Sequence, residues 1–323
     1  MILFVCYGDH IYTHNRILDE IKGCKLGVCN YNWLLKQKNP PKGSYVFLDR
    51  ERMGPWELRI ASALYQHIKN AGPAYRAINN PALMADRQSL LRLLHVHGIN
   101  DFNAYSVTER QMPQKYPVFI RRDYDHHYPV SDLISNEIEL LRTLEKLKAK
   151  GEPEAGLLIV EYCAQPLSGG LFRKLSSYRV ANELFFFNTV HENSWLVKYG
   201  TKNSANDALY TEEQEMIKSN AFKDELTKVF DLAGIEYGRV DFGLVNGQCQ
   251  IYEINTNPTL YPPKEHPNSI RNQNQILGWE KYKDAIRALV TTDPDGPQTG
   301  AFEHKDLVLD TKSWSGYGIP VVR

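Results

Sequence analysis

The sequence has no charge bias, no long apolar run and few cysteines, and each of these absences excludes a class of protein. Its 323 residues include 38 basic and 38 acidic side chains, a formal net charge of zero, without a long basic run. This balance argues against nucleic acid or an anionic membrane as the main partner. No apolar run reaches the length of a membrane span. The opening MILFVCYGDH is typical of a buried strand and not of a signal peptide.

The sequence lacks the cysteine pattern of a zinc site and, after its first strand, the glycine pattern of a dinucleotide site. The cysteines are scattered and odd in number: Cys6, Cys24, Cys29, Cys163 and Cys249. Cys24 and Cys29 alone are too few for a zinc site, so we expect reduced thiols in a cytoplasmic protein. No G-x-G-x-x-G follows the first apolar run, which leaves a dinucleotide site there without support.

The composition that remains is that of a globular chain with a large core. Hydrophobic residues make up 42% of the chain, which suits two or three subdomains. The first part alternates apolar runs with helical patterns and predicts a small parallel α/β domain. The strands expected there span residues 2–7, 25–30 and 44–48, and the helices span residues 15–22 and 55–70.

Three polar or flexible residues, Gly8, Asp9 and His10, follow the first of these strands. Ligands of parallel α/β domains bind at the carboxyl ends of strands, so these residues are candidate substrate contacts. The alternative is that they only shape a turn.

The later part of the chain mixes long helical patterns with strands. Helices are expected over residues 86–97, 132–150 and 279–291 and within 212–234, and a strand over residues 157–162. From Asp293 onward the sequence is rich in Gly, Pro and charge, and we expect an extension that packs back through Trp314 and Tyr317.

The most informative stretch is a predicted β-hairpin. Two β-rich runs, residues 237–245 and 249–255, are separated by the turn signal Asn246-Gly247. Asp241 lies on the first run, and Glu253 and Asn255 lie two apart on the second, where they share a face.

The register of this hairpin decides whether Asp241 joins that face. A two-residue turn at Asn246-Gly247 places Asp241 opposite Tyr252, away from Glu253. A three-residue loop, or a bulge, places Asp241 opposite Glu253. In that case two carboxylates and an amide form an all-oxygen cluster that suits Mg²⁺ bridging phosphates. In the other case three polar residues are simply solvated.

The segments GIEYGRVDF and YEINTNP resemble the last metal-binding strands of ATP-grasp enzymes. The resemblance implies that Asp241, Glu253 and Asn255 are ligands of Mg²⁺ (or Mn²⁺). It also places Asn257 on the loop that borders the acceptor site, where a catalytic role is expected.

Four other segments resemble the same family in the same order. In YPVFIRRDYDHH, Arg121 takes the place of the lysine that meets the nucleotide phosphates, and a guanidinium can neutralise phosphate equally well. In LLIVEY, Glu161 lies at the hinge that binds adenine. In KLSSYRV and WLVKY, Arg179 and Lys198 take the places of basic residues directed at the transferred phosphate. For Arg179 and Lys198 an ordinary salt bridge is the alternative.

One departure from the family concerns the loop that covers the phosphates. Residues 123–128 (DYDHHY) contain no glycine, so the ordinary glycine-rich cover is altered here or lies elsewhere. Transition-metal binding by Asp125, His126 and His127 is a further alternative. Adjacent histidines on a strand point in opposite directions, which disfavours it.

The resemblance implies an α/β fold with an N-terminal parallel domain followed by an ATP-grasp fold of two α+β subdomains. We expect the N-terminal domain over residues 1–80 and a subdomain with the first phosphate-contacting strand and the hinge over residues 81–165. The subdomain with the metal strands is expected over residues 166–292, and a C-terminal extension over residues 293–323.

The chemistry implied is ATP- and Mg²⁺-dependent ligation, in which an acyl phosphate of a small-molecule carboxylate is transferred to an amine. No nucleic acid or membrane partner is expected, and a homodimer is left open. Two alternatives remain: a phosphotransferase whose acceptor keeps the phosphate, and a nucleotide-binding protein without turnover.

Overall fold

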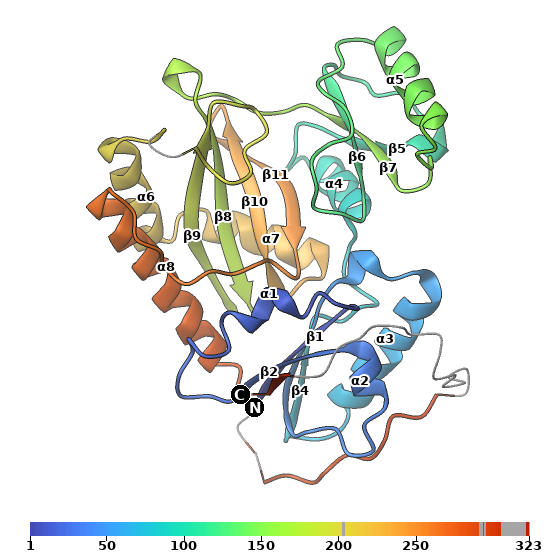
Figure 1. Cartoon of the computed structure of the whole chain (residues 1–323), viewed down its shortest axis with the longest axis vertical. Helices are drawn as coiled ribbons and strands as arrows, with labels where there is room; N and C mark the ends of the chain where they lie inside the picture. Colours follow the sequence, from blue (N-terminus) through green and yellow to red (C-terminus); the bar gives the residue numbers. More distant parts are fainter. Residues whose placement is uncertain (202–203, 291–292, 294, 305–320, 323) are drawn as a thin grey trace.

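The first sheet of the computed structural model is parallel and begins with the first residues of the chain. The structure describes residues 1–201, 204–290, 293, 295–304 and 321–322. The strand order is β12-β2-β1-β3-β4, with β12 antiparallel and the other four strands parallel (Figure 1). The strands are β1 (Ile2–Cys6), β2 (Leu26–Asn30), β3 (Gly43–Phe47), β4 (Tyr75–Ile78) and β12 (Val321–Val322).

Both faces of this sheet are buried, as expected for parallel strands. Leu3 and Val5 of β1 pack in a cluster with α3, whereas Ile2 and Phe4 point to the opposite face and pack in a cluster that includes α8. The helical elements here are α1 (Tyr12–Asn15), α2 (Tyr31–Leu35), η1 (Arg50–Arg52) and α3 (Pro55–Lys69). One core therefore joins the N-terminal sheet to the C-terminal part of the chain.

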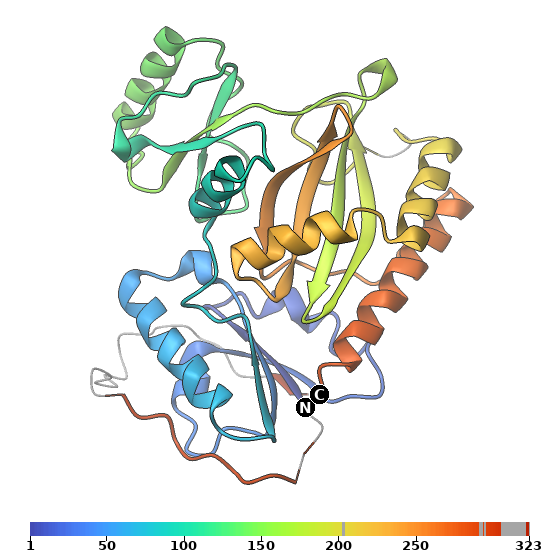
Figure 2. The same cartoon turned by 180° about the vertical axis from the view of Figure 1, so that it is seen from behind.

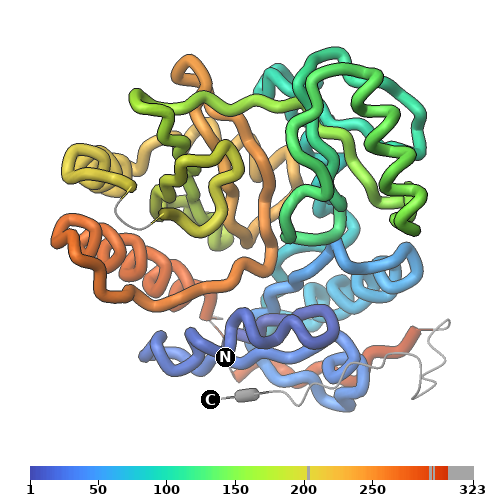
Figure 3. Tube along the Cα trace, turned by 45° about the horizontal axis from the view of Figure 1, so that its top comes forward, coloured from blue at the N-terminus to red at the C-terminus, as the bar shows by residue number. Residues whose placement is uncertain are grey.

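A small antiparallel sheet of order β5-β7-β6 forms the second unit. Figure 3 shows this unit and the sheet of the third unit above the N-terminal one. Its elements, with the preceding helix, are α4 (Arg87–Val96), β5 (Ala104–Ser106), η2 (Val107–Glu109), β6 (Val118–Arg122), α5 (Glu137–Ala149) and β7 (Leu157–Glu161).

The third unit is an antiparallel sheet of order β11-β10-β8-β9. Helix α7 crosses one face of this sheet, as Figure 2 shows from behind, and residues of α4, α7 and the strands share one buried cluster. The elements are η3 (Ser168–Gly170), β8 (Phe172–Val180), β9 (Glu183–Glu192), α6 (Asp207–Ser219), α7 (Lys223–Ala233), β10 (Tyr237–Val245), β11 (Gln248–Asn255) and α8 (Ser269–Arg287). The predicted fold class, a parallel α/β domain followed by two α+β units, is confirmed.

Three predicted helices have different bounds. The helix expected over residues 15–22 is wrong: the helix there is α1, which ends at Asn15, and the following residues form turns that still bury Ile17 and Leu18. Helix α5 begins later than expected because Asn136 caps it. Helix α8 begins ten residues earlier than residue 279, where Asn268 caps a polar first turn that has no apolar periodicity.

The C-terminal extension contacts the N-terminal unit. Phe302 belongs to the cluster on the α3 face of the first sheet, and the side chain of Gln298 donates to the Tyr75 hydroxyl (2.7 Å). Trp314 and Tyr317, through which packing was expected, lie outside the described residues. All five cysteines are free. Among the described residues no helix is long and apolar enough to cross a membrane.

Candidate functional site

The hairpin of β10 and β11 has the two-residue turn, and yet Asp241 and Glu253 lie opposite each other. The turn alone would have placed Asp241 opposite Tyr252. Asn246 and Gly247 both have positive φ (51° and 80°), and Val245 pairs with Gln248, as in a two-residue turn. The pairing then shifts between Asp241 and Phe242, so that Asp241 lies opposite Glu253. A β-bulge therefore brings the two carboxylates to one face.

Asp241 is buried and surrounded by donors. Arg239 donates to both of its oxygens (2.8 and 3.1 Å), and Ser176 donates at 2.8 Å. The ammonium of Lys174 lies 3.0 Å away. Burial by itself raises the pKa of Asp241, but the charges of Arg239 and Lys174 outweigh it and hold the pKa below its usual range. Asp241 is therefore an anion.

Glu253 has a basic environment of its own. Arg87 donates to its Oε2 at 2.7 Å, and Arg121 and His126 approach the same oxygen to 3.6 Å. Burial raises the pKa of Glu253, and the charge of Arg87 is the largest of the effects that lower it well below its usual value. Oε1 of Glu253 accepts no hydrogen bond from a described residue. The carboxylate is ionised and has one oxygen still available.

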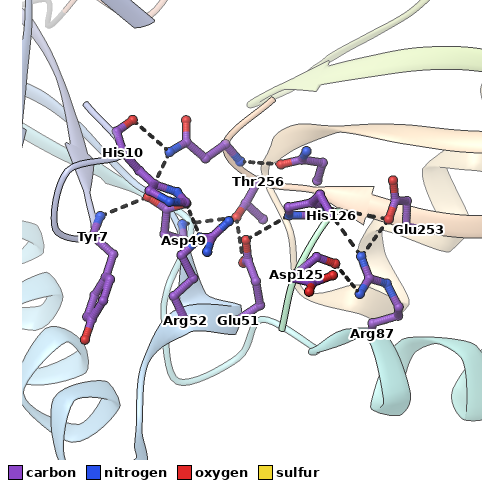
Figure 4. A network of polar contacts seen from close by, with 12 residues as sticks. Tyr7, His10, Asp49, Glu51, Arg52, Arg87, Asp125, His126, Glu253 and Thr256 are labelled. Carbon is purple, nitrogen blue, oxygen red and sulfur yellow. Dashed lines mark hydrogen bonds and ion pairs between the residues drawn. The ribbon is translucent and has the colours of Figure 1, made fainter. Parts of the chain in front are cut away.

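Arg87, at the start of α4, was not among the predicted site residues. Its Nη1 donates to the carbonyls of Arg122 (3.0 Å), Asp123 (2.6 Å) and Asp125 (2.9 Å). The guanidinium thus joins the glycine-free loop 123–128 to Glu253 (Figure 4). The sequence carries no local signal for this role, because an arginine just after a helix N-cap is ordinarily exposed.

The loop after β11 joins the cluster to the N-terminal unit. Asn255 is buried, and its Oδ1 accepts the backbone N–H of Asn257 at 2.9 Å. The Asn257 side chain donates to Asp49 at 2.8 Å and accepts from the Thr13 hydroxyl. Asn257 therefore fixes Asn255 on one side and the carboxyl end of the first sheet on the other.

Two cavities meet at the carboxylate pair. A slot of about 130 Å³ between the second and third units is lined mainly by apolar and aromatic side chains, including Phe119, Trp195 and Tyr252. A polar cavity of about 740 Å³ lies between the N-terminal unit, β8–β11 and α8. Six residues line both: His126, His127, Lys174, Lys198, Asp241 and Glu253.

The structure brings most, but not all, of the predicted residues together. Arg121 lines the slot beside Glu253, and burial lowers its pKa to about 10. Lys198 lines both cavities and lies 4.1 Å over the Tyr128 ring. Glu161 lines the slot, and its buried carboxylate accepts four hydrogen bonds from β5 and the segment before β6. That carboxylate holds the hinge in place.

Arg179 lies outside this arrangement. Its guanidinium donates to Asp231 of α7 at 2.6 Å and to the carbonyl of Ala181 at 3.0 Å. It lines neither of the two cavities. The salt bridge that the sequence left open is the contact present here.

The residues at the junction fit a hard divalent cation bound together with phosphates. The donors are two carboxylates and the amide oxygen of Asn255, the oxygen set that Mg²⁺ prefers. The cations Lys174 and Arg239 lie beside Asp241, and Arg121 lies beside Glu253. A site made of three or more His, Cys, Asp or Glu side chains is not found in the described part of the chain. The alternative transition-metal site at Asp125, His126 and His127 therefore has no support.

The structure is similar to several solved ligases. It resembles the D-alanine–D-alanine ligase of Bacillus anthracis complexed with ATP, with a TM-score of 0.48 and 12% identity over 89% of this chain and 98% of the ligase. The VanG D-Ala:D-Ser ligase of Enterococcus faecalis has a TM-score of 0.46 and 13% identity, over 87% of this chain and 98% of the ligase. An L-amino acid ligase of Bacillus licheniformis has a TM-score of 0.39 and 10% identity, over 79% of this chain and 66% of the ligase.

No protein-family model matches the chain, and the search of curated proteins found no match.

Proposed function

We propose that this chain is an ATP- and Mg²⁺-dependent ligase of the ATP-grasp superfamily that joins a small-molecule carboxylate to an amine. The observation that carries the proposal is the pairing of Asp241 with Glu253 at the junction of an apolar slot and a large polar cavity. A nucleotide and a second substrate fit two such cavities that share a charged centre. Free thiols suit a cytoplasmic setting, which is part of the proposal.

The slot suits the base of a nucleotide, because aromatic side chains stack on bases. Its inner end holds Arg121, Lys174 and Lys198, the charges that a triphosphate requires. Asp241, Glu253 and Asn255 would hold Mg²⁺ (or Mn²⁺), which supplies neutralisation of the phosphate charge when bound. Arg87 contacts Oε2 of Glu253, so Oε1 would be the oxygen of this carboxylate that meets the metal.

The reaction then follows from charge placement. A substrate carboxylate oxygen attacks the γ-phosphorus, the bond to the β–γ bridging oxygen breaks, and ADP leaves with the electron pair. Lys174, Arg239 and Arg121 stabilise the charge that develops on the transferred phosphoryl group. The amine nitrogen next attacks the acyl carbon, and inorganic phosphate leaves. Asn257 borders the cavity in which both organic substrates would meet.

The decisive experiment measures ADP release and hydroxamate formation by the purified protein. ATP, Mg²⁺ and hydroxylamine are combined with pools of amino acids and small carboxylates, because hydroxylamine converts an acyl phosphate into a hydroxamate. We expect one pool to give both products, and Glu253→Gln to lose them. Glu109→Gln, at an exposed salt bridge with Arg92, is the matched control and keeps both.

The other outcomes identify the alternatives. ADP release with a phosphorylated acceptor and no hydroxamate from any pool would make the chain a phosphotransferase. Binding of Mg-ATP without ADP release from any pool would favour a nucleotide-binding protein without turnover. Failure to bind Mg-ATP would exclude the ATP-grasp assignment of this site.

A further inference from the structure

A histidine and a buried carboxylate face each other at the wall of the large cavity. His10 follows β1, and its Nδ1 lies 3.4 Å from Oδ1 of Asp49, which follows β3. The His10 side chain is 25% exposed, whereas Asp49 is 1% exposed. His10 lines both the large cavity and a second, outer pocket of about 610 Å³. The imidazole is therefore reachable from two sides, and its partner is not.

Asp49 is held in one position by contacts from two segments, the end of β1 and the loop after β11. Its Oδ2 accepts the backbone N–H of Tyr7 at 2.9 Å and the side chain of Asn257 at 2.8 Å. Its own N–H donates to the Thr256 hydroxyl at 3.2 Å. Asp49 also has a left-handed backbone (φ 60°), which costs a non-glycine residue some energy and which the surrounding contacts impose.

This carboxylate determines which nitrogen of His10 can act. With Nδ1–H directed at Asp49, the lone pair of a neutral imidazole lies on Nε2. Nε2 has no hydrogen-bond partner among the described residues. Burial raises the pKa of Asp49, and the hydrogen bond with His10 opposes that rise. A neutral histidine held in this orientation presents Nε2 to the cavity as a base.

The pair is connected to the proposed metal ligands through one residue. Asn257 donates to Asp49 through its side chain and to Asn255 through its backbone. Figure 4 shows the row of contacts from Tyr7 and His10 through Asp49 towards Glu253. The base and the phosphate-binding cluster are thus fixed relative to each other by the loop after β11.

We propose that His10 is the general base of the ligation, oriented by Asp49, and that it takes the proton of the acceptor amine at Nε2. The inference rests on the proposed function. The ammonium form of the acceptor gives one proton to His10, and the neutral nitrogen forms the C–N bond. The bond from the acyl carbon to the phosphate oxygen breaks, phosphate leaves with the electron pair and takes the second proton of the nitrogen, and solvent receives the first proton from His10.

Three other charged residues, Asp9, Glu51 and Arg52, line the outer pocket with His10. Arg52 of η1 lies 3.7 Å from the same Asp49 oxygen and lines both cavities with His10. Tyr12 contacts the imidazole edge-on (5.8 Å between centroids), and the loop after β11 contributes the neutral Asn257. Asp49 is therefore the charged group in direct contact with the ring.

The test compares two nucleophiles in the wild type and in His10→Gln. Hydroxylamine is largely unprotonated at neutral pH and requires no base, whereas the α-amino group of an amino acid is largely protonated. Rates of hydroxamate formation and of amide formation with a pool of amino acids are measured between pH 7 and 9. His97→Gln, at an exposed position after α4, is the matched control.

We expect His10→Gln to keep hydroxamate formation within about twofold and to lose amide formation by about 10²- to 10³-fold at pH 7. The loss should shrink as the pH rises from 7 to 9, because the amine then deprotonates by itself. Preserved hydroxamate formation also shows that the variant is folded.

Two results would overturn the inference alone: equal losses with both nucleophiles, or amide formation at pH 7 that matches the wild type. Absence of hydroxamate from the wild type with every carboxylate would overturn the proposed function, and this inference with it.

Discussion

Tyr252 is the extra residue that brings Asp241 and Glu253 opposite each other. The bulge pairs Asp241 with Glu253 and Phe242 with Ile251, which leaves Tyr252 without a partner. The ring of Tyr252 lies over Gly243, and its hydroxyl donates to the carbonyl of Cys163 at 3.1 Å. The same bulge therefore aligns the carboxylates and fixes the hinge loop that closes the slot.

Gly243→Ala is expected to disturb the slot and leave the carboxylate pair in place. A methyl group there would overlap the Tyr252 hydroxyl and come within 2.9 Å of Cζ, so the ring must move. The hydrogen bond to Cys163 would be lost, which costs about 1 kcal/mol of stability. We expect Mg-ATP to bind about tenfold more weakly by calorimetry. Adding Tyr252→Phe removes the closest clash, and the double variant should recover part of the affinity; equal affinity in all three proteins would contradict this account.

Arg87→Met is expected to destabilise the fold and release the loop 123–128. The change removes a buried donor from three carbonyls and the closest partner from Glu253. Removing one partner of a buried ion pair costs about 3–5 kcal/mol. We expect the free energy of unfolding in urea to fall by about 3 kcal/mol, with faster amide hydrogen exchange in the loop.

The same helix offers the control for Arg87. Arg92 pairs with Glu109 at 2.8 Å on the surface, where both side chains are more than one-third exposed. Arg92→Met should change stability by less than about 1 kcal/mol. Similar losses in both variants would show that Arg87 has no special anchoring role.

The hairpin shows how much of the site could be predicted from the sequence. Period-two patterning and Asn246-Gly247 predict both strands and their turn, because these signals are local. Patterning also predicts the parallel N-terminal domain. The sequence could not decide whether the hairpin contains a bulge, since an extra residue at Tyr252 alters no local pattern. The motif resemblance was needed to choose the register that the structure has.

Contacts between distant segments could not be predicted from one sequence. Arg87 and Glu253 are 166 positions apart, and the hydrogen bond between them depends on how two units are placed. Arg179 shows the converse, because its motif position is right for a basic strand residue while its side chain pairs with α7. The pattern of a strand predicts which side chains share a face of the sheet. It does not predict which residues from other segments those side chains contact.

His14 should make stability depend on pH below neutrality. It is fully buried between Phe4 and Tyr237, and burial lowers its pKa to about 3. The unfolded chain, with an ordinary histidine pKa near 6.5, binds more protons below that value. Stability from this group is therefore complete above about pH 6.5 and is lost as the pH falls towards 3. The loss between pH 7.5 and 5 is about 2 kcal/mol.

Urea unfolding at several pH values checks this expectation. His14→Gln should be less stable at pH 7.5 and should lose less stability on acidification than the wild type. The remaining dependence is expected from His191, whose pKa burial lowers to about 4. His97→Gln, which changes an exposed histidine, should keep the full dependence. A His14→Gln profile parallel to that of the wild type would contradict the assignment.

Trp195 should report nucleotide binding directly. It follows β9 and lines the slot, where its ring lies 5.0 Å from that of Phe119 and edge-on to Tyr162 at 5.7 Å. A base entering the slot would meet this ring, so ATP should change the tryptophan fluorescence of the wild type. Base–aromatic stacking contributes about 1–3 kcal/mol. We therefore expect Trp195→Ala to weaken binding by about 10- to 100-fold.

The choice of substitution separates the signal from the affinity. Trp195→Phe keeps an aromatic ring and should bind ATP within a few-fold of the wild type by calorimetry while losing the fluorescence change. Trp56→Phe removes an exposed tryptophan of α3, outside the slot, and should keep the change. If Trp195→Phe keeps the full fluorescence response, or Trp195→Ala keeps full affinity, the base does not bind in the slot. Calorimetry would then have to locate the nucleotide through variants of the large cavity.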